Sequence, residues 1–111
     1  MNQGDVILTS VPQADGVIKN RPAIFLREMP RYRDVLVCGV STQLHHEVRG
    51  LDEIIQRADS DFAGTGLKSA SLVRLGFLAV LPRDAVVRSV GKVSSERHKR
   101  LLKRLSNYLT R

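Results

Sequence analysis

The sequence contains a single cysteine, Cys38, and no tryptophan, and aromatic residues make up only 5% of its 111 residues. One cysteine excludes an intrachain disulfide and is compatible with a reducing cytosol. No apolar run approaches the roughly 18 residues that a membrane helix needs. The first residues carry no charged segment followed by an apolar core, so we expect neither a signal peptide nor a membrane partner. We therefore expect a cytoplasmic globular protein whose residues 1–111 form one domain.

Motifs for metal-dependent or nucleotide-dependent catalysis are also missing. One cysteine and the adjacent pair His45-His46 do not make a structural zinc site, because neighbouring side chains of an extended segment point in opposite directions. There is no glycine-rich phosphate loop and no Gly-x-Ser-x-Gly nucleophile elbow. Cys38 lies within an apolar segment, which favours a core position over a nucleophilic one. The sequence therefore predicts no metal and no cofactor.

Acidic residues are scarce in the second half of the chain. Residues 1–61 carry seven Lys and Arg against nine Asp and Glu, whereas residues 62–111 carry eleven against two, so the two parts have net charges of −2 and +9. An uneven basic excess is typical of proteins that bind nucleic acid or another polyanion. A basic surface that only serves solubility would give the same composition, but we expect nucleic acid as the partner.

Short apolar and β-branched segments, separated by turn-forming residues, predict five or six strands. They cover residues 5–10, 22–27, 34–41, 51–56, 71–81 and 86–93, with loops at residues 11–20, 28–33, 42–50 and 57–69. The near-continuous apolar segment 34–41 indicates a central strand. Gly39 within it predicts a bulge or a close backbone approach.

From residue 94 the spacing of apolar residues changes to that of a helix, with Ser94 or Ser95 as its N-cap and Glu96 in its first turn. One stripe is expected to face the sheet: His98, Leu101, Leu102, Leu105, Tyr108 and Leu109. The other faces are covered by basic residues: Arg97, Lys99, Arg100, Lys103 and Arg104. The predicted fold is mainly β, a small, strongly bent antiparallel sheet or open barrel with one C-terminal helix packed on it.

Arg21 stands directly before Pro22, at the start of the second predicted strand. Proline suits the first residue of a strand and not its middle, and it favours an extended conformation for the residue before it. We therefore expect the guanidinium of Arg21 to project out of the fold, where it can meet a phosphate.

Polar groups on two other predicted strands could join Arg21. Ser41, Thr42 and Gln43 follow the central strand, where they can donate hydrogen bonds to a phosphate or form a plain polar turn. Arg74 interrupts an apolar strand, so it emerges at an edge, pairs with a carboxylate or lines a cleft. Two guanidiniums and the hydroxyl of Ser41 would suit phosphodiester chemistry, because they can neutralise charge on a pentacoordinate phosphorus and hold a non-bridging oxygen.

At these residues the sequence resembles the MazF/PemK (Kid-like) toxins of bacterial type II toxin–antitoxin modules. The similarity includes Gly-Asp-Val-Ile-Leu at residues 4–8, Lys-Asn-Arg-Pro-Ala-Ile at 19–24, Val-Ser-Thr-Gln-Leu at 40–44 and Ser-Leu-Val-Arg-Leu at 71–75. The closing strand and helix follow the family pattern as well. The resemblance implies an SH3-like β-barrel that forms a homodimer and is neutralised by an antitoxin protein.

The resemblance also implies a metal-independent endoribonuclease, an mRNA interferase that cuts single-stranded RNA at short sequences. The 2′-hydroxyl would attack the adjacent phosphorus and leave a 2′,3′-cyclic phosphate and a 5′-hydroxyl. By position, Arg21 would serve in acid–base or phosphate-stabilising work, Ser41 would replace the usual threonine, and Arg74 would act as acid or transition-state stabiliser. RNA binding is expected at the residues beside them: Lys19, Asn20, Thr42, Gln43, His45 and His46.

One departure from the family pattern concerns the general base. Members that use the arginine at position 74 often have an aspartate two residues later, where this chain has Gly76. One alternative is therefore a non-catalytic toxin of the same fold that poisons a protein such as DNA gyrase. Another is a non-catalytic RNA-binding barrel, although the few aromatic residues are expected mostly in the core and not on a base-stacking surface: Phe25, Phe62, Phe77, Tyr32 and Tyr108.

Overall fold

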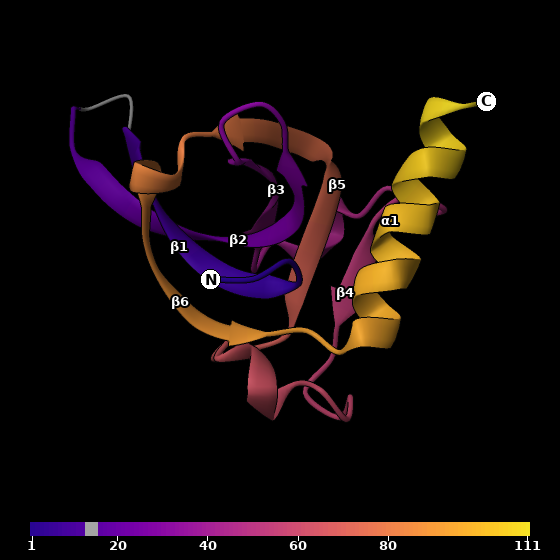
Figure 1. The fold of residues 1–111 in the computed structure, drawn as a ribbon. Coiled ribbons are helices and arrows are strands. Elements are labelled where there is room, and N and C mark those ends of the chain that lie inside the picture. The colour runs from indigo at the N-terminus through magenta and orange to yellow at the C-terminus, as the bar shows by residue number, and fades with distance from the viewer. Residues whose placement is uncertain (13–15) are drawn as a thin grey trace.

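The computed structural model describes residues 1–12 and 16–111, which form one antiparallel sheet and a C-terminal helix (Figure 1). The strands are β1 (Asp5–Pro12), β2 (Ile18–Met29), β3 (Asp34–Ser41), β4 (Glu53–Ile55), β5 (Ser71–Leu81) and β6 (Val86–Lys92), followed by the helix α1 (Ser95–Leu109). Short 3-10 turns lie at Leu44–His46, Ala63–Thr65 and Arg83–Ala85. Among the described residues, no helix is both long and apolar enough to cross a membrane.

The hydrogen-bonded order of the strands is β4-β5-β3-β2-β1-β6. Figure 1 shows that this sheet curves strongly, while β4 and β6 remain its two edges, so the barrel is open. The predicted fold class is therefore confirmed, and β3 and β5 have the predicted bounds. The segment predicted at residues 51–56 contributes only the three residues of β4.

The first hairpin differs from the prediction. β1 continues to Pro12 and β2 begins at Ile18, so much of the predicted loop 11–20 is strand, and its central residues 13–15 lie outside the described residues. Pro22 consequently lies inside β2, paired with Leu8, and the prediction that it starts the strand was wrong. The proline is tolerated because β2 pairs with β3 only from Ala23 onward, so the missing N–H removes no bond to β3.

The far end of β2 was also predicted too short. The strand runs on to Met29, into the predicted loop 28–33, because Glu28 and Met29 pair with β3 residues. The strand ends directly before Pro30, and polar Glu28 does not end it earlier, because cross-strand pairing decides where a hairpin strand stops.

Apolar clusters cover both faces of the sheet. The larger lies between the sheet and α1, and it joins Leu101 and Leu105 of the helix to sheet residues such as Ile24. The smaller lies on the opposite face and consists of Ile7, Ala23, Phe25, Val35 and Val37. Successive residues of β2 thus point to different clusters, as the two-residue period of a strand requires. One face of the sheet carries the helix, and the other is left for a site.

The start of α1 matches the prediction, but its last turn does not. Ser94 caps the helix, since its hydroxyl oxygen accepts a hydrogen bond from the backbone N–H of Arg97 at 3.1 Å. Tyr108 and Leu109, expected on the buried stripe, are exposed by 46% and 67%. The 15-residue helix continues past the apolar cluster that Leu101 and Leu105 join, so its last turn has no sheet beneath it.

Arg97 is the main exception to the predicted helix surface. It was expected to face solvent, but it is 5% exposed. Its guanidinium contacts three carboxylates, at 2.8 Å from Glu53 and at 2.9 Å from both Asp59 and Asp61. Arg100 also donates to Glu53. The helix arginines therefore neutralise carboxylates of the acidic first half, and part of the +9 charge of the second half is paired within the molecule.

Candidate functional site

The three predicted catalytic residues line one cleft of about 550 Å³, which we call the central cleft. Its lining comes from four neighbouring strands: Thr9, Ser10, Arg21, Pro22, Ala23, Val37, Gly39, Val40, Ser41, Arg74, Phe77, Ala79 and Leu81. Two of these, Ala23 and Val37, belong to the apolar cluster on the face opposite α1. The structure thus brings together Arg21 of β2, Ser41 of β3 and Arg74 of β5 on the sheet face that the helix leaves open.

Strand register explains why these side chains meet. β2 and β3 pair Ala23 with Gly39, and Arg21 and Ser41 each lie two residues further along their strands, just beyond this last pair. On the other side of β3, Gly39 pairs with Arg74 of β5. Residues two apart on a strand share a face, so both guanidiniums and the hydroxyl reach the same side of the sheet.

A bulge in β5 shapes the middle of the central cleft. The pairing of β3 with β5 jumps at Gly39, whose partner is Arg74, and residues 75–77 of β5 have no partner on β3. A Cβ atom on residue 39 would lie 2.8 Å from ring atom Cδ1 of Phe77, so only glycine leaves room for this ring position. The bulge or close approach predicted at Gly39 is confirmed.

Phe77 is a cleft residue that sequence reasoning placed in an apolar core segment. Its side chain is 61% exposed. The guanidinium carbon of Arg74 lies 5.1 Å from the centre of its ring, which is a cation–π contact. Gly39 indicates space for a large neighbour, but the sequence does not show that Phe77 fills it. The expectation that this aromatic residue is unavailable for base stacking was wrong.

Local hydrogen bonds fix the hydroxyl of Ser41. The backbone N–H of Gln43 donates to its oxygen at 3.0 Å, so Ser41 forms the expected polar turn and still keeps its own O–H to donate. Nearby, the hydroxyl of Thr9 donates to the backbone oxygen of Arg21 at 3.3 Å. Thr9 and Ser10 were not predicted as site residues, because nothing in the sequence sets them apart from other strand hydroxyls.

The predicted RNA-binding residues adjoin the central cleft without lining it: Lys19, Asn20, Thr42, Gln43, His45 and His46. The first two precede Arg21 on the exposed part of β2, and the next two follow Ser41 at the end of β3. The two histidines occupy the exposed turn Leu44–His46, with their ring centres 4.3 Å apart. All six lie within a few residues of Arg21 or Ser41.

The side chains that line the central cleft offer guanidinium and hydroxyl groups. Among the described residues that line the cleft, none carries a carboxylate or an imidazole, and Gly76, which has no side chain, lies in the bulge of β5. Cys38 is fully buried, as predicted, and burial raises the pKa of its thiol to about 12, so the thiol stays protonated. In residues 1–12 and 16–111, no three His, Cys, Asp or Glu side chains are arranged to hold a metal ion.

Comparisons with known proteins give a family and a fold. The model of the family described as PemK-like, MazF-like toxin of type II toxin–antitoxin system matches residues 2–109. Among solved structures, Mycobacterium tuberculosis toxin MazF-mt6 is similar over 96% of each chain, with a TM-score of 0.68 and 20% sequence identity. At that identity the likeness shows the fold alone. No curated protein matches the sequence.

Proposed function

The chain belongs to the PemK-like, MazF-like toxins of type II toxin–antitoxin systems, and we propose that it is a metal-independent, sequence-specific endoribonuclease that cuts single-stranded RNA. The observation that carries the proposal is the central cleft, where two guanidiniums and a hydroxyl from three strands lie together. In this proposal residues 1–111 act as one toxin domain, in the cytoplasm and as a homodimer. The family implies an antitoxin partner.

The proposed reaction is attack by a ribose 2′-hydroxyl on the adjacent phosphorus. The O2′–P bond forms, the P–O5′ bond breaks, and the products are a 2′,3′-cyclic phosphate and a 5′-hydroxyl. The 2′-hydroxyl gives its proton to water, and the departing 5′ oxygen takes one from water. Arg21 and Arg74 neutralise the charge that builds up on the phosphorane, while the free O–H of Ser41 holds a non-bridging oxygen.

Catalysis in this proposal rests on electrostatic stabilisation and positioning. Within residues 1–12 and 16–111, the cleft lining provides no carboxylate or imidazole base, and a guanidinium is a poor proton acceptor. Preorganised donors in such a site are each worth roughly 10²–10³ in kcat. The two arginines and the fixed serine hydroxyl are donors of this kind.

Incubation of the purified protein with a long single-stranded RNA, with and without EDTA, tests the proposal. We expect cleavage at one short recurring sequence under both conditions, and a rate lower by roughly 10²–10³ in the Arg21→Ala variant. Arg111→Ala is the matched control, because Arg111 lies just beyond the end of α1, away from the cleft, and should leave the rate unchanged. Absence of products at any sequence, or strict dependence on a metal ion, would contradict the proposal.

A second candidate is a non-catalytic toxin that poisons a protein target such as DNA gyrase. It is favoured by one observation, the lack of a carboxylate or imidazole among the described side chains that line the central cleft. Expression of the Arg21→Ala variant separates the two candidates. Undiminished toxicity of this variant, together with a wild-type protein that cuts no RNA, would favour the protein-poisoning toxin.

A further inference from the structure

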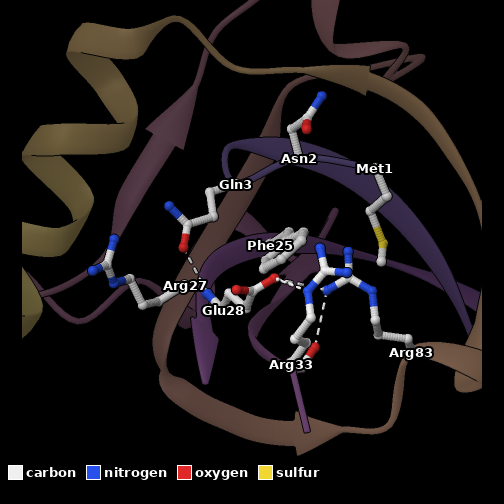
Figure 2. Close-up of a pocket in the computed structure, with 8 residues that line it drawn as sticks. All are labelled: Met1, Asn2, Gln3, Phe25, Arg27, Glu28, Arg33 and Arg83. Atoms are coloured by element: carbon white, nitrogen blue, oxygen red, sulfur yellow. Dashed lines mark hydrogen bonds and ion pairs between the residues drawn. The ribbon is translucent and has the colours of Figure 1, made fainter. Parts of the chain in front are cut away.

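A second pocket of about 570 Å³ (Figure 2), which we call the basic pocket, adjoins the central cleft. The two are close because Phe25 in the basic pocket is two residues beyond Ala23 of the cleft on β2. Likewise, Arg83 of the pocket is two residues beyond Leu81 of the cleft, just past the end of β5. Ala23 and Phe25 belong to the same apolar cluster, so both hollows open on the face opposite α1.

Two guanidiniums in the basic pocket share one carboxylate oxygen. Oε1 of Glu28 lies 2.9 Å from Nε of Arg33 and 3.2 Å from Nη1 of Arg83. Nη1 of Arg83 also donates to the backbone oxygen of Arg33 at 2.9 Å, which ties the two arginines together. Glu28 is itself held by Gln3, whose side-chain oxygen accepts its backbone N–H at 2.7 Å. Figure 2 shows the two arginine side chains on the same side of Glu28.

This arrangement fixes the arginine pair without neutralising it. Glu28 offsets one of two positive charges, and Arg33 donates through Nε alone, so its terminal nitrogens donate to no other described residue. Arg27 lies on the opposite side of Glu28 and makes no ion pair within the described part of the chain (Figure 2). The described side chains that line the basic pocket therefore hold three guanidiniums and one carboxylate.

We propose that the basic pocket binds phosphate groups of the substrate RNA, several nucleotides away from the phosphate that is cut. The inference rests on the proposed function and extends it. Two guanidiniums fixed side by side match the paired oxygens of a phosphate, and Arg27 takes a neighbouring one. Arg21 and Arg27 are six residues apart on β2, about 20 Å at the rise of a strand. One extended RNA strand can therefore occupy both hollows.

Phosphate contacts of this kind position a strand and carry no sequence information. The basic pocket should therefore raise RNA affinity without changing the sequence that is cut. An acidic segment of a protein partner would meet the same charges. RNA is favoured because the pocket lies beside the central cleft, where the proposed substrate already binds.

The test compares the double variant Arg33→Ala/Arg83→Ala with Lys99→Ala/Lys103→Ala, which removes two charges from the exposed surface of α1. The probe is a uniformly 2′-O-methylated 12-nucleotide RNA of random sequence, which lacks the attacking hydroxyl. We expect the arginine variant to bind about tenfold more weakly. The slope of log affinity against log salt should fall by about 0.7 for each lost phosphate contact. The lysine variant should keep the wild-type slope.

Cleavage provides a second readout. On unmodified RNA, the arginine variant should show a raised KM, an unchanged kcat and the wild-type cleavage sequence. Arg27 takes part in no ion pair or hydrogen bond among the described residues. The variant Arg27→Ala therefore leaves the contacts of Arg33 and Arg83 with Glu28 intact. Arg27→Ala should lower the RNA affinity about threefold. The slope of log affinity against log salt should again fall by about 0.7 for the lost phosphate contact.

Four outcomes would overturn the inference. Unchanged affinity and slope in both arginine variants would overturn it and leave the proposed nuclease standing. A shift of the cleavage sequence would show that the pocket reads bases. A loss of binding to a polyglutamate peptide, with RNA affinity unchanged, would assign the pocket to an acidic protein partner. A wild-type protein that neither binds the 12-mer nor cuts RNA would remove the inference together with the proposed function.

Discussion

At the scale of single residues, the contact between Gly39 and Phe77 decides where one candidate catalytic group lies. Phe77 occupies the space that a Cβ on residue 39 would need, and Arg74 rests against the exposed face of its ring. A change at Gly39 should therefore act on the guanidinium of Arg74 through the ring. Gly39 is thus a positioning residue in the proposed reaction.

The variant Gly39→Ala tests this role. Because the ring of Phe77 is 61% exposed, it can rotate outward and the sheet can persist. We expect a small change in Tm but a 10- to 100-fold slower cleavage of RNA, the loss typical of a misplaced group. In a Phe77→Ala background the same substitution should have no further effect. If Gly39→Ala slowed cleavage equally in the wild-type and Phe77→Ala backgrounds, Gly39 would not act through the ring of Phe77.

Single residues also show where the sequence was informative. Arg21, Ser41 and Arg74 could be proposed because charged or polar side chains at the end of an apolar segment, or inside one, must pair or line a cleft. Phe77 could not, since an apolar side chain in an apolar strand looks like a core residue until the bulge of β5 turns it outward. The burial of Arg97 was also missed. A charged helix residue is expected to face solvent, and the carboxylates that pair with it lie more than 30 residues away in the sequence.

At the scale of elements, Arg97 joins α1 to the acidic segment that follows β4. Hydrogen bonds from Arg97 hold the pKa of Asp61 well below its usual range, against the opposing effect of burial. Burial raises the pKa of Glu53, but hydrogen bonds from Arg100 and Arg97 outweigh it and the net shift is downward. Both carboxylates therefore stay ionised and attached to the helix at neutral pH.

Removal of the buried guanidinium should destabilise the fold. In Arg97→Met, Glu53 and Asp61 lose their buried partner, which costs about 3–5 kcal/mol of unfolding free energy. Urea unfolding at pH 7 measures this. Arg100→Met is the matched control, and because the Arg100 side chain is 47% exposed its loss should cost about 1 kcal/mol or less. Equal losses in the two variants would contradict the role given to Arg97.

Acid should weaken the same attachment. The pKa values of Asp61 and Glu53 are lower in the folded chain than the value of about 4 expected for unfolded carboxyls. Their contribution is therefore complete above the unfolded pKa and is lost as the pH falls below about 4. Urea unfolding between pH 7 and pH 3 should show this decline, and it should be shallower in Arg97→Met. An identical decline in both proteins would refute the linkage.

The bounds of a strand could be predicted from the sequence where a long apolar run alone decides them. β3 and β5 were read correctly because long apolar and β-branched runs between turn-forming residues favour strands, even though residues 76–80 of β5 are exposed. The hairpin of β1 and β2 was read too short, since polar residues around Pro22 suggest a loop until pairing with β1 extends the strand. Which residues pair across a hairpin depends on the three-dimensional fold. The strand propensities of single residues do not show it.

At the scale of the whole molecule, the two faces of the sheet differ in the charged groups and the hollows that they carry. One face holds α1, whose arginines are engaged with carboxylates of the first half. The other face holds the central cleft and the basic pocket, with Arg21, Arg74 and the arginine pair around Glu28. The net charge of +7 predicted a polyanion partner but not this division, because composition does not show which charges fold against each other.

The proposed use of the open face is cleavage of RNA by its own 2′-hydroxyl, and the attacking group can be tested directly. Once a cleavage site is mapped, a substrate is made with a single 2′-deoxynucleotide directly 5′ of that bond and incubated with the protein in EDTA. We expect no cut at the modified bond, unchanged cuts at other sites, and 2′,3′-cyclic phosphate and 5′-hydroxyl ends on the products. Cleavage of the deoxy-substituted bond at the normal rate would contradict the proposed reaction.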